Sequence, residues 1–186
     1  EVNQDVISFQ CALKHALRQD PDIILIGELR DRETTETAMH IADTGHLVFS
    51  TLHTPDAPQT ITRLSHFFTH EEQDLIFDQM AKNLQGVVCQ RLVRTVDGRG
   101  RVPCCEIMFK TPVTFKLILE RRISDLPGVL RSGVDGMQSF DRHLVDLVKA
   151  KKVSLEEALT IVEDESAFNR LLKGKSSGDD RGGLLG

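Results

Sequence analysis

The sequence predicts an α/β fold in which a parallel sheet is followed by a helical carboxy-terminal region. Two short apolar runs, Ile23–Ile26 and Leu47–Phe49, have the length and aliphatic content of buried strands. Between them, Arg32–Asp43 has the pattern of a helix that ends near Gly45. Strand, helix and strand in this order predict a parallel pair, and the first strand is expected to be buried on both faces.

Composition limits the class of protein. The 186 residues are 40% hydrophobic and 27% charged, which is typical of one well-buried domain with a small helical appendage. The net charge of −5 argues against a general nucleic-acid surface, and no apolar run approaches the ~20 residues of a membrane span. Because the chain opens with Glu1 in helix-like sequence and shows no secretory signal, we expect a fragment whose amino-terminal part is missing.

The four cysteines do not have the spacing of a metal site or a disulfide framework. Cys104 and Cys105 are adjacent, whereas Cys11 and Cys89 lie far away in sequence. A structural zinc site would need two closely spaced cysteine pairs. We therefore expect reduced thiols and no zinc.

Capping and turn residues predict the remaining elements. Thr69 and Glu72 form a capping box, from which a long helix is expected to run to about Val88. Asp97–Gly100 reads as a turn between two extended segments, which predicts a β-hairpin. The other expected elements are the extended segments Gln90–Thr95 and Arg101–Phe109, and helices at Ser8–Arg18, Pro58–Phe67, Thr114–Arg121, Ser124–Ser132, Gln138–Lys151 and Ser154–Val162.

Both predicted strands run directly into residues that are able to do chemistry. The first continues into Gly27 and Glu28, and the second into Ser50, Thr51 and, two residues on, His53. Ligands of open parallel sheets bind beyond the carboxyl ends of the strands, so Glu28 and His53 are expected to face one crevice. Such a carboxylate can hold the water shell of magnesium and orient an attacking water. Taken alone, a strand-end acid is more often a solvated carboxylate.

The stretch Phe9–Thr54 as a whole resembles the pilus-retraction and type II/IV secretion ATPases, most closely the PilT/PilU branch. The matching segments are ALKHALRQDPDIILIGELRDRET, TGHLVFSTLHT and, at Gly136–Val148, GMQSFDRHLVDLV. The resemblance implies the later part of a RecA-like P-loop NTPase core over residues 1–110, including the hairpin. A helical region over residues 111–172 follows, and the Gly-rich residues 173–186 are expected to be a disordered tail.

The resemblance also implies roles for single residues. Glu28 is expected to be the Walker B glutamate, catalytic and close to magnesium, and His46 and His53 the catalytic histidines of the His box. Arg30 and Thr51 are expected on the nucleotide side, where Arg30 pairs with an acid and Thr51 senses the γ-phosphate. From the sequence alone, His46 can equally be a helix-to-strand connector.

Two departures from the pattern of P-loop enzymes bear on the cofactors. Gly27 stands where many of these enzymes carry a magnesium-binding aspartate, and no G-x-x-x-x-G-K-[ST] loop is present. We expect that loop upstream of Glu1. Binding of ATP and magnesium would then need it, and the 186 residues alone should not hold ATP tightly.

The resemblance implies ATP hydrolysis that powers type IV pilus retraction and twitching motility. It implies a cytoplasmic hexameric ring, peripheral at the inner membrane, that binds an inner-membrane pilus-base protein and no nucleic acid. The absence of C-x-x-C pairs around Val96–Pro103 favours the retraction branch, while VTFKLILE after Pro112 keeps only part of that branch's AIRNLIRE motif. A PilU-like paralogue therefore stays open. The alternative is a non-catalytic ring-assembly or pilus-base-binding module.

Three other features have ordinary structural explanations. His66 and His70 have metal-binding spacing, but Thr69 starts a new helix between them. The acidic cluster Glu163–Glu165 is expected to be a solvated helix end. Leu144, Leu147 and Val148 are expected to be core residues.

Overall fold

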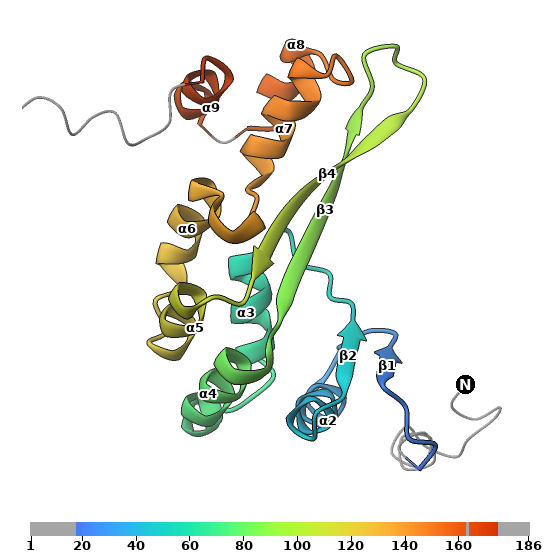
Figure 1. Cartoon of the computed structure of the whole chain (residues 1–186), viewed down its shortest axis with the longest axis vertical. Helices are drawn as coiled ribbons and strands as arrows, with labels where there is room; N and C mark the ends of the chain where they lie inside the picture. Colours follow the sequence, from blue (N-terminus) through green and yellow to red (C-terminus); the bar gives the residue numbers. More distant parts are fainter. Residues whose placement is uncertain (1–17, 163, 175–186) are drawn as a thin grey trace, which may run out of the picture. The chain divides into compact units, whose positions relative to one another are not determined.

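The computed structural model describes residues 18–162 and 164–174, which form two compact units (Figure 1). The first, called the sheet unit, contains residues up to His53 and Leu64–Asn83. The second, called the hairpin unit, contains Thr54–Arg63 and the residues from Leu84 onward. Residues 8–17 of the helix predicted over residues 8–18, residues 175–186 of the predicted tail, and Glu163 lie outside the described residues.

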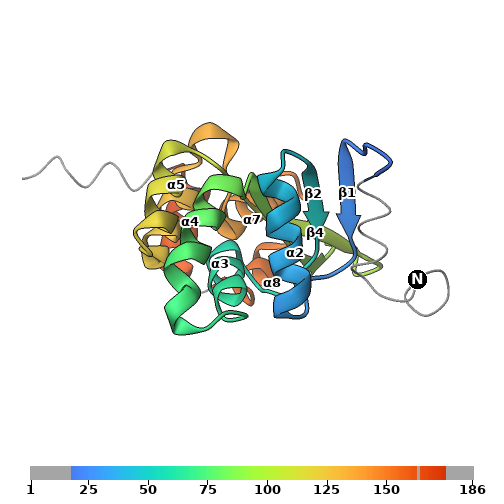
Figure 2. The ribbon, with the colours of Figure 1, turned by 90° about the horizontal axis from the view of Figure 1, so that it is seen from below.

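The sheet unit is built on a parallel strand pair. Strand β1 (Ile23–Ile26) pairs with β2 (Leu47–Ser50), with the two strands aligned end to end in register. Helix α2 (Arg32–Asp43) covers one face of this pair (Figures 1 and 2). On that face lies a small core of buried side chains: Ile24, Ile26, Ala38 and Ile41. The predicted strand–helix–strand unit and its parallel pairing are confirmed.

The expectation that the first strand is buried on both faces is wrong. Ile23 and Leu25 are 58% and 75% exposed, because alternate side chains of a strand point to opposite faces and α2 covers only one. Phe49 of β2 is exposed as well. Within the part of the chain that the structure describes, the second face of this sheet is uncovered.

A 3₁₀ turn and a second helix complete the sheet unit. The 3₁₀ turn η1 (His70–Glu72) leads into helix α4 (Gln73–Asn83). The carboxylate of Asp43 at the end of α2 accepts hydrogen bonds from Gln79 and Asn83, which ties the two helices together.

The predicted continuation of this helix to about Val88 is wrong, because the helix ends at Asn83 and a strand begins at Gly86. A Cβ at Gly86 would lie 3.1 Å from the carbonyl oxygen of Met108. Glycine permits this close approach of two backbones, and the segment that follows alternates buried and exposed residues as a strand does.

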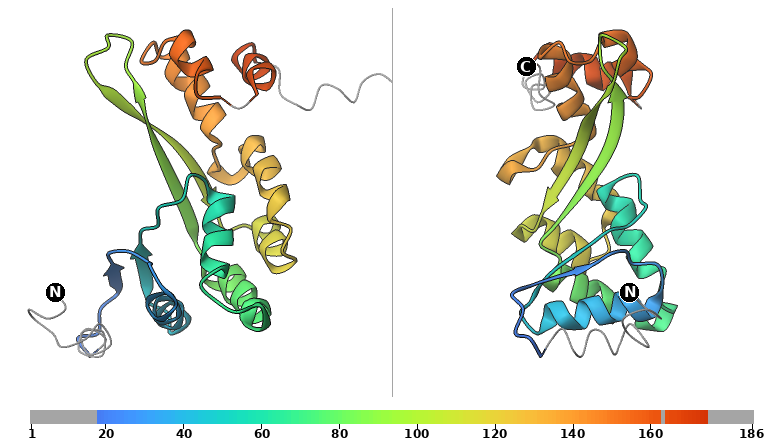
Figure 3. Two further views of the ribbon diagram at one scale, coloured as in Figure 1. Left: turned by 180° about the vertical axis from the view of Figure 1, so that it is seen from behind. Right: turned by 90° about the vertical axis from the view of Figure 1, so that its right-hand side faces the viewer.

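The hairpin unit is organised by a long antiparallel pair, β3 (Gly86–Arg94) and β4 (Arg101–Phe109). The turn at Asp97–Gly100 is where the sequence predicts it. The inner face of the hairpin is buried. Helix α7 (Phe140–Lys149) packs against β4 and runs beside the hairpin in Figure 3. The predicted hairpin is confirmed, although β3 begins four residues earlier than expected.

Helix α3 (Ala57–Ser65) precedes the hairpin, and its position agrees with the helix predicted over Pro58–Phe67. The elements after the hairpin are α5 (Pro112–Leu119), η2 (Ile123–Asp125), α6 (Leu126–Ser132), η3 (Val134–Gly136), α7, α8 (Leu155–Leu159) and α9 (Glu165–Leu172). The sequence predicts α5, α6, α7 and α8 with somewhat different ends, but it does not predict η3 or α9 as separate elements. Helix α8 is shorter than predicted. Leu144 and Leu147 are buried, which confirms them as core residues. Among the described residues, no helix combines the length and apolar character needed to cross a bilayer.

A buried carboxylate joins the hairpin to two helices. Glu106 of β4 lies on the inner face and accepts a 2.9 Å hydrogen bond from the backbone N–H of Ala57, at the start of α3. Burial raises its pKa, and hydrogen bonds from the backbone of Ala57 and Phe140 oppose that shift. Phe140 is the first residue of α7, so one side chain ties together the beginnings of two helices.

Candidate functional site

The carboxyl ends of β1 and β2 are held together by two hydrogen bonds that lie just beyond the strands. The backbone N–H of Leu29 donates to the carbonyl of Thr51 at 3.0 Å. The hydroxyl of Thr51 donates to the carbonyl of Gly27 at 2.6 Å. These bonds fix the two segments that carry the predicted site residues, so the position of Glu28 does not depend on its side-chain contacts alone.

Glu28 and His53 meet at this edge of the sheet, as the sequence predicts. The Nε2 atom of His53 lies 3.3 Å from Oε1 of Glu28, and a guanidinium nitrogen of Arg30 lies 2.7 Å from Oε2. The Glu28 side chain is 22% exposed, whereas that of His53 is 84% exposed. The carboxylate is thus partly enclosed, with a histidine and an arginine on its two oxygens.

This arrangement keeps Glu28 ionised. The hydrogen bond from Arg30 is the largest cause that lowers the pKa of Glu28, while desolvation acts in the opposite direction and His53 contributes less. The same pairing raises the pKa of Arg30. A carboxylate with a lowered pKa is a poor proton acceptor near neutral pH. It is better suited to attract a cation and to orient water through its charge.

The other two residues expected on the nucleotide side also lie here. Arg30 pairs with an acid as predicted, and that acid is Glu28 itself. The hydroxyl hydrogen of Thr51 is used in the bond to Gly27, so it must leave that bond before it can donate to a phosphate. A Cβ at Gly27 would meet no atom within 4 Å, so the space beside it is open.

His46 lies at the other end of the sheet. It precedes β2, and its Nδ1 atom is 3.0 Å from the hydroxyl of Thr44, which follows α2. The whole of β2 separates it from His53. Within one chain, the structure therefore leaves His46 out of the cluster around Glu28 and places it in the helix-to-strand connection.

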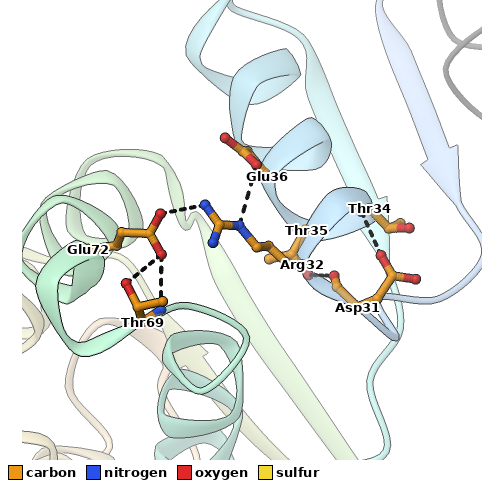
Figure 4. A network of polar contacts seen from close by, with 7 residues as sticks. All are labelled: Asp31, Arg32, Thr34, Thr35, Glu36, Thr69 and Glu72. Carbon is orange, nitrogen blue, oxygen red and sulfur yellow. Dashed lines mark hydrogen bonds and ion pairs between the residues drawn. The ribbon is translucent and has the colours of Figure 1, made fainter.

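Sequence reasoning missed the contacts that fix the start of α2 (Figure 4). Asp31 caps the helix by accepting from the backbone N–H of Thr34 at 2.9 Å. Arg32, the first helical residue, pairs with Glu72, whose carboxylate also accepts from the backbone and hydroxyl of Thr69 at 3.0 and 2.8 Å. The capping box was readable in the sequence, but its partner 40 residues away was not.

Ser50 is named in the sequence analysis only as a strand-end residue, with no role assigned to it. It is the last residue of β2, and its hydroxyl oxygen is buried with no hydrogen-bond partner among the described residues. Buried polar groups nearly always have a partner, and an orphan beside a candidate site needs an explanation. The only signal in the sequence was a polar residue at the end of an otherwise apolar strand.

The parallel strand pair with its covering helix is part of a RecA-like fold, and the comparisons with known proteins agree with this fold. Residues 2–162 match the model of the type II/IV secretion system protein family. The chain belongs to this family. It spans about half the length of the curated relatives PilU and PilT and of the PilT structure described below.

Similar proteins point to one branch of the family. The chain is 38% identical over 180 residues to the type IV pilus ATPase PilU of Pseudomonas aeruginosa, covering 96% of this chain and 47% of that protein. It is 43% identical over 159 residues to the pilus retraction ATPase PilT of the same organism, covering 85% and 46%. The crystal structure of the pilus retraction motor PilT with bound ADP matches with a TM-score of 0.79 at 37% identity, covering 91% and 48%.

Proposed function

We propose that this chain is part of an ATPase that powers type IV pilus retraction. The single observation that carries the proposal is the meeting of Glu28 and His53 at the carboxyl ends of adjacent parallel strands. It is supported by similarity to proteins named PilU and PilT and to a PilT structure that holds ADP. The alternative, a non-catalytic assembly module, gives no reason for an ionised carboxylate to be enclosed at this edge.

In this proposal Glu28 acts through its charge. It attracts the hydrated magnesium ion of the nucleotide and orients the attacking water, because its lowered pKa makes proton abstraction unfavourable. Arg30 holds the carboxylate in place until the nucleotide binds. His53, on the second oxygen, is well exposed and so is free to follow a reacting group.

The remaining parts of the site belong to the longer protein. We propose that the phosphate-binding loop lies outside these 186 residues and supplies most of the contacts to ATP. The resemblance to the retraction ATPases supports two further parts of the proposal. One is a ring of six subunits, and the other is a partner protein at the pilus base in the inner membrane. The proposed location is the cytoplasmic side of the inner membrane.

Replacing Glu28 by glutamine in the longer protein tests the proposal. Glu28→Gln keeps the shape of the side chain and removes its charge, so ATP should still bind while turnover falls by about 10²-fold or more. Glu71→Gln, which removes an exposed carboxylate on the turn η1, is the matched control and should hydrolyse ATP normally. Steady-state hydrolysis and nucleotide binding are measured together. Hydrolysis by Glu28→Gln at the wild-type rate would support the assembly module instead.

A further inference from the structure

One end of the hairpin unit gathers cations from two separate segments. Arg94, Arg99 and Arg101 lie at the tip of the β3–β4 hairpin. Three lysines, Lys149, Lys151 and Lys152, lie at the end of α7 and in the loop before α8. The backbone N–H of Val96 donates to the carbonyl of Lys152 at 2.9 Å, which joins the two segments (Figures 1 and 3). We call these six residues the basic tip.

Little in the fold explains this gathering of charge. Arg94 and Arg101 are direct cross-strand partners, an arrangement that costs stability because like charges repel. The one carboxylate of the hairpin turn, Asp97, accepts from the hydroxyl of Thr95 and the backbone N–H of Arg99 and so shapes the turn. All six cationic side chains are exposed, in a chain whose net charge is −5.

Apolar side chains accompany the cations. Leu92 and Val96 of the hairpin are 59% and 64% exposed, and Leu155 at the start of α8 is also exposed. Leu92 and Val96 are in the same hairpin as the three arginines, and Leu155 follows the three lysines in sequence, with Glu156 and Glu157 directly after it. The two segments thus carry exposed apolar side chains as well as the six cations. No tyrosine or tryptophan occurs in the chain, and no phenylalanine lies in either segment, so nucleic-acid bases would find no ring to stack on here.

We propose that the basic tip binds the surface of an anionic phospholipid bilayer. Each lysine or arginine close to such a surface contributes a favourable electrostatic term, and short exposed apolar side chains enter the boundary between headgroups and acyl chains. We choose a lipid surface as the binding partner because the basic tip consists of a turn and a loop. A flat, fluid bilayer can contact such a tip without a matching pocket. The inference does not rest on the ATPase proposal, because it uses no residue of the site around Glu28.

Sedimentation of the 186-residue chain with vesicles tests this inference. With vesicles of phosphatidylcholine that contain phosphatidylglycerol, the wild-type chain should sediment at low salt, and the bound fraction should fall as salt rises. Little of the chain should sediment with vesicles of pure phosphatidylcholine. A triple variant, Arg99→Gln, Arg101→Gln and Lys152→Gln, should lower the partition coefficient by about 10²-fold. Val96→Ser should lower it less and leave the salt dependence unchanged.

A matched variant controls for the loss of total charge. Lys116→Gln, Arg131→Gln and Lys173→Gln together remove three exposed cations of the same unit that lie outside the basic tip, and vesicle binding should stay within about twofold. Glu28→Gln should bind vesicles as the wild type does, so a failure of the ATPase proposal stays separate. Equal losses for the two triple variants would overturn the inference. Tighter binding of the wild-type chain to polyglutamate or to duplex DNA than to the anionic vesicles at the same salt concentration would also overturn it, in favour of an acidic protein or a nucleic acid.

Discussion

The Nε2 atom of His53 lies 3.3 Å from Oε1 of Glu28, across the carboxyl ends of two adjacent parallel strands. Arg30 occupies the other oxygen of the same carboxylate at 2.7 Å. The two contacts are unequal in their effect, because the bond from Arg30 is the largest cause of the lowered pKa of Glu28 and that from His53 is the smallest. This inequality can be tested in the chain as it stands.

We expect Arg30→Gln to move the pKa of Glu28 back toward its ordinary value of 4.5, and His53→Gln to move it less. The carboxylate resonance of Glu28 in a ¹³C NMR titration measures both. Because the folded pKa is lowered, the ion pair stabilises the fold above pH 4.5, and its contribution is lost as the pH falls through the lowered pKa. A larger shift in His53→Gln than in Arg30→Gln would contradict the assigned order of the two contacts.

Ser50→Ala should make the chain more stable. The buried hydroxyl has no partner among the described residues, so burying it costs desolvation free energy that no hydrogen bond offsets. Its removal should therefore raise the free energy of unfolding by about 1 kcal/mol. Ser139→Ala is the matched control, because the Ser139 hydroxyl caps α7 and its loss should cost about 1 kcal/mol. Chemical denaturation of both variants measures whether the free energy of unfolding rises in Ser50→Ala and falls in Ser139→Ala. A loss of stability in Ser50→Ala would show that its hydroxyl has a partner after all.

The pair Arg32–Glu72 should contribute modestly to the sheet unit. A double-mutant cycle with Arg32→Ala and Glu72→Ala should give a coupling free energy of about 0.2–1 kcal/mol that decreases with added salt, because both side chains are partly exposed. The same cycle with Glu36→Ala serves as the comparison, because Oε2 of Glu36 lies 3.9 Å from Nε of Arg32. It should give a smaller coupling free energy. Equal coupling in the two cycles would remove the special role of Glu72.

Glu106 should make the stability of the hairpin unit depend on pH. Burial raises its pKa, so the folded state favours the protonated form, and stability falls as the pH rises from 4.5 through the folded pKa. Glu106→Gln should keep the hydrogen bond from Ala57 and lose this dependence. Glu106→Ala should cost about 1–3 kcal/mol at any pH, because it leaves buried N–H donors unpaired.

Thermal unfolding of the three proteins between pH 4 and pH 8 compares these outcomes. A wild-type chain whose pH dependence matches that of Glu106→Gln would show that Glu106 titrates normally.

The sequence by itself determined the local elements and the meeting of Glu28 with His53. Strand length, aliphatic content and the intervening helix are properties of neighbouring residues, and parallel pairing then brings the carboxyl ends of both strands to one edge. The same reasoning placed the capping box at Thr69 and the turn at Asp97–Gly100, because caps and turns are also local.

Only the tertiary structure decided which surfaces meet. It showed that Leu25 stays exposed, that His46 lies away from Glu28, and that Arg32 pairs with Glu72. It also placed Glu106 at the starts of two helices. Each of these features depends on contacts between residues far apart along the chain. Such contacts form only when whole elements pack together, and the periodicity within one segment carries no information about them.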